Sequence, residues 1–200
     1  MTDVANDLMY TSSSSLYNSN CDVSPARPGI ASTVWRYGYT GVKDANEMTA
    51  AIKAAVENEF ITEAEGEPLY AETAVLRALY YYLLTTFGDV PFYTERLTEE
   101  NREHIATLPR MDADSTRDYC IEELKELLVE KEALPMVRTY DGQEFRAGAA
   151  VGYVVAAKMC MWNERWEEAI AFLSKVEDIY GHYADSPSAF GTDYPLTDVP

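Results

Sequence analysis

The chain has 200 residues, which is enough for one large domain or two small ones. Hydrophobic residues make up 47% of it and charged residues 25%, ordinary values for a folded globular protein and unlike those of a disordered chain. Because 34 Asp and Glu residues outnumber 16 Lys and Arg residues, the net charge of −18 argues against nucleic acid as a partner and against a basic membrane-binding patch.

The cysteines indicate neither a disulfide framework nor a metal site. There are three, Cys21, Cys120 and Cys160, and their odd count and wide spacing do not fit a set of paired cysteines. No two of them have the Cys-x-x-Cys spacing of structural zinc sites. Cys160 lies in an apolar run with helical spacing, which predicts a small core residue. We therefore expect neither a metal nor a cofactor.

No segment of the sequence has the pattern of a membrane span or an export signal. The longest uninterrupted stretch of apolar residues and glycine, residues 147–157, is too short to cross a bilayer. Residues 1–10 have neither the basic start nor the apolar core of a signal peptide. Cys21 follows Asn-Ser-Asn, whereas a lipidated cysteine follows small apolar residues. We expect no signal peptide or lipobox within this chain.

Residues 1–31 are predicted to form an irregular loop region, because Ser, Asn, Pro and Gly recur along them. A first helix is predicted over 33–58, where apolar residues recur every three or four positions, and Ser32 is its candidate N-cap. Gly38 and Gly41 would each cost this helix about 1 kcal/mol relative to Ala. Close packing of a neighbouring element would explain why they are tolerated.

A second helix is predicted over 68–87. Pro68 suits the first position of a helix, and Gly88 suits the residue that ends one. The helix has two apolar stripes, so it is expected to be buried on more than one side. The first stripe is Ala71, Val75, Ala78 and Tyr82, and the second is Leu76, Leu79, Leu83 and Phe87.

Residues 89–113 are predicted to form an extended connection, bracketed by prolines and polar in the middle. A third helix is predicted over 115–133, with Ser115 and Asp118 placed as in a capping box. Pro135 would end it.

A fourth helix is predicted over 146–162 and a fifth over 165–180. Only a tight turn at Asn163 and Glu164 separates them, so they are expected to pack as an antiparallel pair. Gly152 and Gly148, four residues apart in the fourth helix, indicate a close approach to another helix.

Together these elements predict an all-α fold of tetratricopeptide-like helical hairpins with long irregular loops. Five helices are expected, and no segment alternates apolar and polar residues as a half-buried strand does. Helix–turn–helix units that repeat near 34 residues are typical of tetratricopeptide arrays. The best local match is AKMCMWNERWEEAI at 157–170, which places small residues where the two helices of a hairpin approach each other.

Several segments, in order along the chain, resemble the SusD/RagB family of outer-membrane glycan-binding lipoproteins. The most specific is AETAVLRALYYYLLTTFGDVPF at 71–92, which is similar to that family's Leu-Arg-Ala, Tyr-Tyr and Phe-Gly-Asp-Val-Pro sequence. The others are WRYGYTGVKDAN at 35–46, YCIEELKELLVEKEALP at 119–135, and 146–183 with its WNERWEEAI and YGHY sequences.

The resemblance divides the chain into three parts. It implies an irregular loop region at 1–31, a SusD-like helical domain at 32–183, and a truncated linker at 184–200. Family members are longer, so this linker is expected to run toward a C-terminal portion that is missing from the chain.

The same resemblance implies a function. The protein would bind an oligosaccharide or polysaccharide at the cell surface, without catalysis, and deliver it to a TonB-dependent, SusC-like outer-membrane transporter. It would be located at the cell outer membrane and exposed at the surface. Attachment to the membrane would be only through a lipid anchor, which is absent from this chain.

The N-terminal loop region contains the candidate glycan-binding residues Tyr17, Asn20, Asp22 and Arg27. Sugar recognition needs a flat apolar face together with planar polar groups that pair with hydroxyls, and these residue types combine both. The resemblance implies that part of the glycan site precedes the first helix, although no motif there aligns residue by residue. Plain loop packing is the alternative interpretation of these side chains.

Other patterns have simpler structural explanations. Trp162 and Trp166 could clasp a sugar ring, but packing in the turn between the last two helices is favoured. His104 and His182 are isolated and lie in no metal-binding or catalytic motif. We expect no catalytic residues, so the protein is not predicted to be an enzyme.

Asp112, Asp114 and Glu123 have the spacing of calcium-loop positions one, three and twelve. Arg117 stands where that loop requires Gly, so a capped, acidic helix start is favoured.

A second function is compatible with the predicted fold. A tetratricopeptide-like adaptor would hold a peptide or protein partner in a helical groove, and an acidic groove would favour basic peptides.

Overall fold

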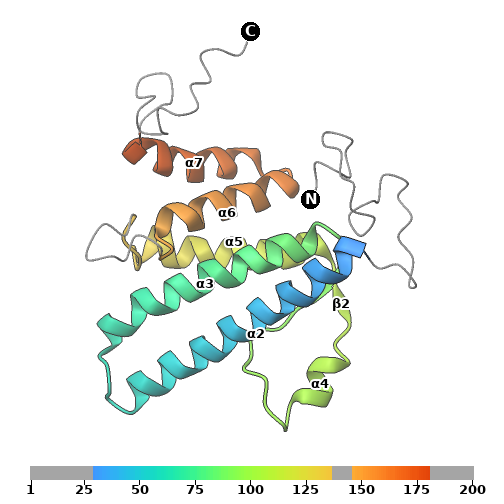
Figure 1. The fold of residues 1–200 in the computed structure, drawn as a ribbon. Helices are drawn as coiled ribbons and strands as arrows, with labels where there is room; N and C mark the ends of the chain where they lie inside the picture. The colour runs from blue at the N-terminus through green and yellow to red at the C-terminus, as the bar shows by residue number, and fades with distance from the viewer. Residues whose placement is uncertain (1–28, 137–145, 181–200) are drawn as a thin grey trace, which may run out of the picture.

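The computed structural model describes residues 29–136 and 146–180 (Figure 1). Within these ranges the chain forms six α-helices, one π-helical turn and one two-stranded sheet. In chain order the elements are α2 (Gly29–Glu57), α3 (Glu63–Thr85), β1 (Val90–Pro91), α4 (Arg102–Ala106), β2 (Arg110–Met111), α5 (Ala113–Lys125), the π-helical turn η1 (Glu126–Glu130), α6 (Ala149–Trp162) and α7 (Trp166–Tyr180).

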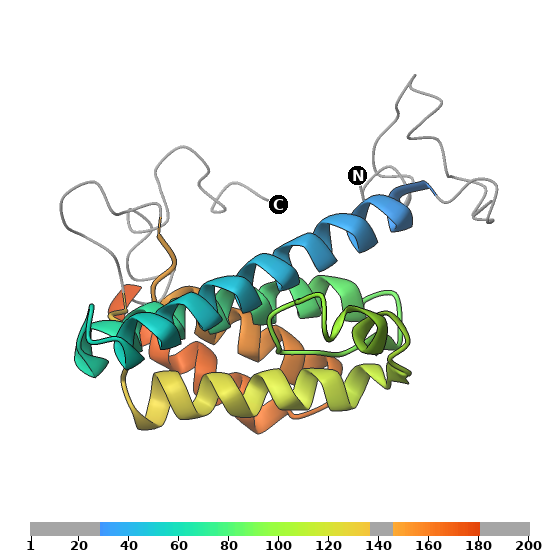
Figure 2. The ribbon, with the colours of Figure 1, turned by 90° about the horizontal axis from the view of Figure 1, so that it is seen from below.

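The long helices pack as successive hairpins. Helix α2 packs on α3, α3 packs on both α5 and α6, and α6 packs on α7. Figure 1 shows this order across the molecule, and Figure 2 shows α5 on the side away from α2. The arrangement confirms the predicted all-α class with tetratricopeptide-like hairpins. None of the described helices is long and apolar enough to cross a membrane.

Helix α3 is the central element of the core. Its residues Ala71, Val75 and Ala78 are buried, as the first predicted stripe requires. The second predicted stripe is wrong, because Leu83 and Phe87 on that side are exposed. The other buried direction of α3 is formed instead by Ala74, Tyr81, Leu84 and Thr85.

The starts of the first two helices differ from the prediction. Helix α2 begins at Gly29, so Ser32 lies inside it and is not an N-cap. Helix α3 begins well before Pro68, because Thr62 and Glu65 form a capping box. The Thr62 N–H donates to the Glu65 carboxylate at 2.8 Å, and the Glu65 N–H donates to the Thr62 hydroxyl at 3.3 Å. These two reciprocal hydrogen bonds satisfy backbone N–H groups that have no partner within the helix. Because the helix begins at Glu63, Pro68 lies inside it and not at its first position.

The third helix also starts earlier than expected. Its N-cap is Asp112, whose Oδ1 accepts a hydrogen bond from the Ser115 N–H at 2.8 Å. Ser115 is therefore a residue of the first helical turn and not the N-cap. Hydrogen bonding from the Ser115 side chain and from its backbone N–H holds the pKa of Asp112 below its usual range. Beyond Lys125 the helix continues as the π-helical turn η1, which the sequence pattern did not indicate.

The three carboxylates with calcium-loop spacing have separate structural partners. Asp112 caps α5, Asp114 pairs with Arg117, and Glu123 pairs with Arg77 at 2.5 Å. No group of three or more His, Cys, Asp or Glu side chains in the described ranges is arranged to hold a metal ion.

Close helix contacts explain two of the glycines. A Cβ added at Gly152 would lie 2.8 Å from Val75 Cγ2 and would overlap the side chain of Leu128. A Cβ added at Gly41 would overlap the ring of Tyr80 on α3. Both contacts are closer than real Cβ atoms allow, so Gly permits the approach of neighbouring helices at these two places. The prediction for Gly148 is wrong, because this residue is the N-cap of α6 and an added Cβ there would overlap the backbone carbonyl of Met136, outside any helix.

The last two helices form the predicted antiparallel pair, joined by the tight turn at Asn163 and Glu164. Glu164 has a φ of 57°, a left-handed conformation that reverses the chain. The Asn163 side chain fastens this turn to α5, because it accepts from Arg117 Nε at 2.6 Å and donates to Asp118 Oδ1 at 2.8 Å.

The prediction that Trp162 and Trp166 pack inside this turn is wrong. Both are more than half exposed, at 53% and 56%, and the hydrogen bonds of Asn163 hold the turn to α5 instead. The Arg117 guanidinium lies 5.5 Å from the centre of the Trp162 ring.

Candidate functional site

The connection between α3 and α5 folds back on the helices. Helix α3 ends at Thr85 with Thr86 as its C-cap, and Gly88 just beyond it has a φ of 107°, a conformation that favours glycine. Strands β1 and β2 then pair antiparallel, with Val90 opposite Met111, and they draw the two ends of the connection together. Along the chain α4 comes after β1 and before β2, and Figure 1 shows it below β2. The predicted extended connection therefore contains three short elements that its composition did not indicate.

Two tyrosines, the buried Tyr81 and the half-buried Tyr39, fasten this connection to the helices. The Tyr81 hydroxyl donates to the Tyr93 carbonyl at 2.7 Å and accepts from the Tyr93 N–H at 2.9 Å. The Tyr39 hydroxyl donates to the Pro91 carbonyl at 2.7 Å. Burial raises the pKa of Tyr39 and of Tyr81 above the ordinary phenol value, so both hydroxyls stay protonated and remain hydrogen-bond donors.

Aromatic rings cluster around the fastened segment. The Phe92 ring lies 4.8 Å from that of Tyr81 and meets the Tyr119 ring edge-on at 4.7 Å, both measured between centroids. The Tyr93 ring stacks parallel to the Tyr39 ring at 6.3 Å. These are favourable aromatic geometries, and they hold the rings in defined orientations.

A small pocket opens beside this cluster, between the connection and α5. Its volume is about 220 Å³. Tyr119 on α5 is 47% exposed, so part of its ring remains available to a ligand. The lining residues are Phe92, Tyr93, Thr94, Glu95, His104, Ile105, Leu108 and Tyr119.

The chemistry of this lining suits a sugar ring. Tyr119 and Phe92 offer aromatic surface on which the C–H face of a pyranose can stack. His104 and Glu95 offer an imidazole and a carboxylate to hydroxyl groups. The pocket is smaller than the ~300–1,000 Å³ typical of drug-sized ligands, which limits it to a group about the size of one ring.

The candidate residues Tyr17, Asn20, Asp22 and Arg27 lie outside the described ranges, and their role stays a prediction. No sequence motif singles out Tyr119 or Phe92 as site residues, and His104 is isolated in the sequence. The two aromatic residues that directly follow the Phe-Gly-Asp-Val-Pro segment were the available signal.

Comparison with known proteins places the chain beside SusD-like proteins, although no family model matches it. The SusD-like protein P25 of Formosa agariphila is 26% identical over 178 residues. The match covers 86% of this chain and 32% of that protein. The chain thus spans about a third of the length of the curated relative that it matches.

Solved structures agree with this similarity. The surface glycan-binding protein A from Bacteroides uniformis is 28% identical, with a TM-score of 0.62 over 73% of this chain and 31% of that one. A SusD-like protein from Bacteroides fragilis is 25% identical, with a TM-score of 0.66 over 82% of this chain and 30% of that one. In sequence and in fold, the chain is similar to part of these longer proteins.

Proposed function

We propose that this chain, being SusD-like in sequence and fold, is part of a protein that binds glycan without cleaving it. The likeness to a surface glycan-binding protein supports this proposal. The main structural support for glycan binding is the pocket beside Tyr119. Its lining combines exposed aromatic surface with an imidazole and one carboxylate.

The proposal extends to the protein's setting. Glycan would be bound at the cell surface, on the outer membrane, and then delivered to a TonB-dependent, SusC-like transporter. The family resemblance is the support for this partner and this location. Tyr17, Asn20, Asp22 and Arg27 are proposed as a second set of glycan contacts.

Isothermal titration of the 200-residue chain against a panel of oligosaccharides tests the binding function. The panel contains α- and β-linked glucans, mannans and galactans. We expect at least one of them to bind, and Tyr119→Ala to weaken that binding about tenfold, because removal of an aromatic anchor commonly costs more than about 1 kcal/mol.

Tyr37→Ala is the matched control, since Tyr37 is also an exposed tyrosine but lies on α2 outside the pocket lining. It should bind as tightly as the unchanged chain. Failure of every oligosaccharide to bind would contradict the proposal. Equal affinity of the Tyr119→Ala variant would leave glycan binding intact but would place it elsewhere.

The adaptor function stays a second hypothesis. It predicts that a peptide, and no glycan, is the principal ligand of the helical hairpins. The same titrations separate the two, because the adaptor hypothesis expects no oligosaccharide in the panel to bind.

A further inference from the structure

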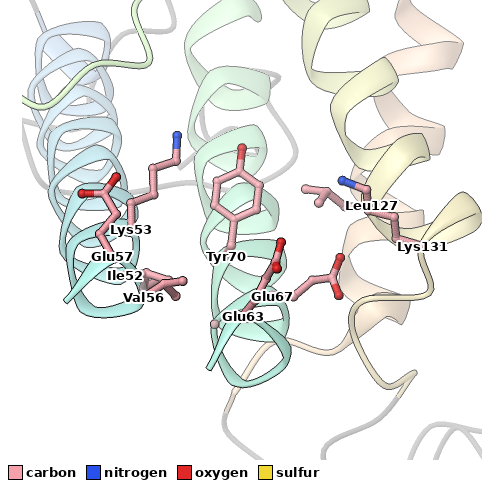
Figure 3. A pocket seen from close by; sticks show the side chains of 10 residues that line it. Ile52, Lys53, Val56, Glu57, Glu63, Glu67, Tyr70, Leu127 and Lys131 are labelled. Atoms are coloured by element: carbon pink, nitrogen blue, oxygen red, sulfur yellow. The ribbon is translucent and has the colours of Figure 1, made fainter. Parts of the chain in front are cut away.

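A second, larger pocket lies at the opposite end of α3 from the aromatic cluster. Its volume is about 300 Å³, and α2, α3 and the η1 region line it (Figure 3). The lining residues are Ile52, Lys53, Val56, Glu57, Glu63, Gly66, Glu67, Tyr70, Leu127 and Lys131. Among the described residues, its lining shares none with that of the aromatic pocket.

The floor of this pocket is apolar and held in place. Ile52, Val56 and Leu127 contribute aliphatic surface beside the ring of Tyr70. The Tyr70 hydroxyl donates to Glu123 Oε1 at 3.1 Å, which fixes the ring. A Cβ added at Gly66 would lie 2.8 Å from Val56 Cγ2, so glycine permits α3 to approach α2 here.

The π-helical turn η1 forms one wall of the pocket. Leu127 lies within the turn, and Lys131 is the residue that ends it. The turn is well defined, because the Tyr153 hydroxyl donates to the Leu128 carbonyl at 2.8 Å and the Ala133 N–H donates to the Leu127 carbonyl at 2.9 Å. π-Helical turns are rare and occur frequently at functional sites.

The rim has more negative than positive charge. Three carboxylates, those of Glu57, Glu63 and Glu67, stand on it beside two lysines. Lys131 is already paired with Glu126 at 2.7 Å, and this pairing raises the pKa of the lysine. The Lys53 ammonium lies 5.8 Å from the centre of the Tyr70 ring. The rim therefore has a net negative charge that favours binding of an added cation.

Phe60, a large apolar residue, lies in the sequence between the lining residues Glu57 and Glu63. Phe60, in the turn that joins α2 to α3, is 81% exposed. Exposed aromatic residues are typical anchors of protein–protein contacts. The pocket lining comes from the helices on both sides of this turn.

We propose that this pocket docks a basic segment of a partner protein, in which an arginine or lysine alternates with aliphatic residues. The stem of the basic side chain would lie on Ile52, Val56 and Leu127 while its charge meets the carboxylates of the rim. Long cationic side chains bury their aliphatic stems in this way and keep the charged end in a polar setting. Charge complementarity with the acidic rim, in a chain of net charge −18, selects a basic occupant.

Fluorescence anisotropy of a labelled hexapeptide tests this docking site. The peptide alternates leucine and arginine and has an amidated end. We expect it to bind the 200-residue chain, and the Glu63→Gln/Glu67→Gln variant to bind it about tenfold more weakly. A second peptide with citrulline in place of arginine, which keeps the shape and removes the charge, should lose affinity to a similar degree.

Glu103→Gln/Glu167→Gln is the matched control, since it removes the same charge from two exposed carboxylates outside the pocket. It should bind the arginine peptide as the unchanged chain does. Equal weakening in both double variants would overturn the proposal, because it would reveal diffuse attraction to an acidic protein. Equal binding of the citrulline peptide, or no binding at all, would also overturn it.

Methyl NMR spectra of the chain with the arginine peptide locate the contact directly. We expect chemical-shift changes at Ile52, Val56 and Leu127 and none at Leu108 in the aromatic pocket. Changes confined to other methyl groups would contradict the proposed site. This result is independent of glycan binding, because oligosaccharide and peptide are measured separately and at different pockets.

Discussion

At the scale of single residues, Arg77 shows how a polar group is accommodated in the core. It is 3% exposed, and its guanidinium donates to Asn46 Oδ1 at 3.0 Å and to Glu123 Oε1 at 2.5 Å. The Tyr70 hydroxyl donates to the same carboxylate oxygen. One buried cation thus joins α2, α3 and α5, and each polar group in the cluster has a partner.

Removal of this cation is expected to be costly. Arg77→Met should lower the free energy of unfolding by about 3 kcal/mol, because the largely buried Glu123 would lose its ion partner. Urea unfolding followed by circular dichroism measures this change. Arg96→Met is the control, since Arg96 pairs with Glu47 at 2.8 Å on the surface and should contribute about 1 kcal/mol or less. Equal losses in the two variants would contradict this account of the buried pair.

At the scale of elements, the packing of α6 depends on the absence of a side chain at Gly152. This residue faces Val75 on α3 and Leu128 in η1, both of them buried. The apolar spacing of α6 is that of a helix buried on several sides, since it packs on α3, α5 and α7. The closeness of these contacts leaves no room for an added methyl group.

Gly152→Ala is expected to destabilise the protein by about 1–3 kcal/mol, through overpacking. At an exposed helical position the same change would stabilise by about 1 kcal/mol, so the sign of the effect is the test. Thermal unfolding monitored by circular dichroism gives that sign. Val151→Ala, at the exposed neighbouring position, should change stability by about 0.5 kcal/mol or less. A more stable Gly152→Ala variant would show that the interface is looser than described.

At the scale of the whole molecule, an excess of acidic residues is partly balanced by arginines that bridge helices. Arg165, at the start of α7, pairs with Asp118 at 2.8 Å and with Glu122 at 2.6 Å, both on α5. It also pairs with Glu168 on its own helix at 2.6 Å. Hydrogen bonds from the Arg165 guanidinium hold the pKa of Glu168 below its ordinary value of 4.5. The last described hairpin is thereby tied to α5.

This network predicts a pH dependence with a definite sign. A carboxyl group whose pKa is lowered by folding stabilises the protein above its unfolded pKa, and that contribution is lost as the pH falls through the folded pKa. The stability advantage of the unchanged chain over Arg165→Gln should therefore be full at pH 6 and shrink below about pH 4.5. Urea unfolding of both proteins from pH 6 to pH 3 measures it.

Comparison of the two proteins removes the effect of the other carboxyl groups. Protonation of those groups at low pH relieves self-repulsion in a chain of net charge −18, and it does so in both proteins alike. A difference in stability that stays constant from pH 6 to pH 3 would exclude the proposed role of the carboxylates.

The sequence by itself determined the features that depend on neighbours along the chain. The spacing of apolar residues predicted the five long helices but not α4. Gly88 predicted that α3 ends close before it, and Asn163 with Glu164 predicted the turn between α6 and α7. Helix starts were less predictable. Ser32, Pro68 and Ser115 are residue types that suit a first turn, but other residues cap α3 and α5.

Only the tertiary structure decided which distant residues meet. The aromatic pocket exists because the hydroxyls of Tyr39 and Tyr81 hold the backbone at Pro91 and Tyr93. Arg77 likewise finds its carboxylate on another helix, at Glu123. Partners so far apart in the chain leave no local periodicity, and their meeting depends on how whole helices pack. The sequence therefore indicated the type of scaffold, and packing of the scaffold created both pockets.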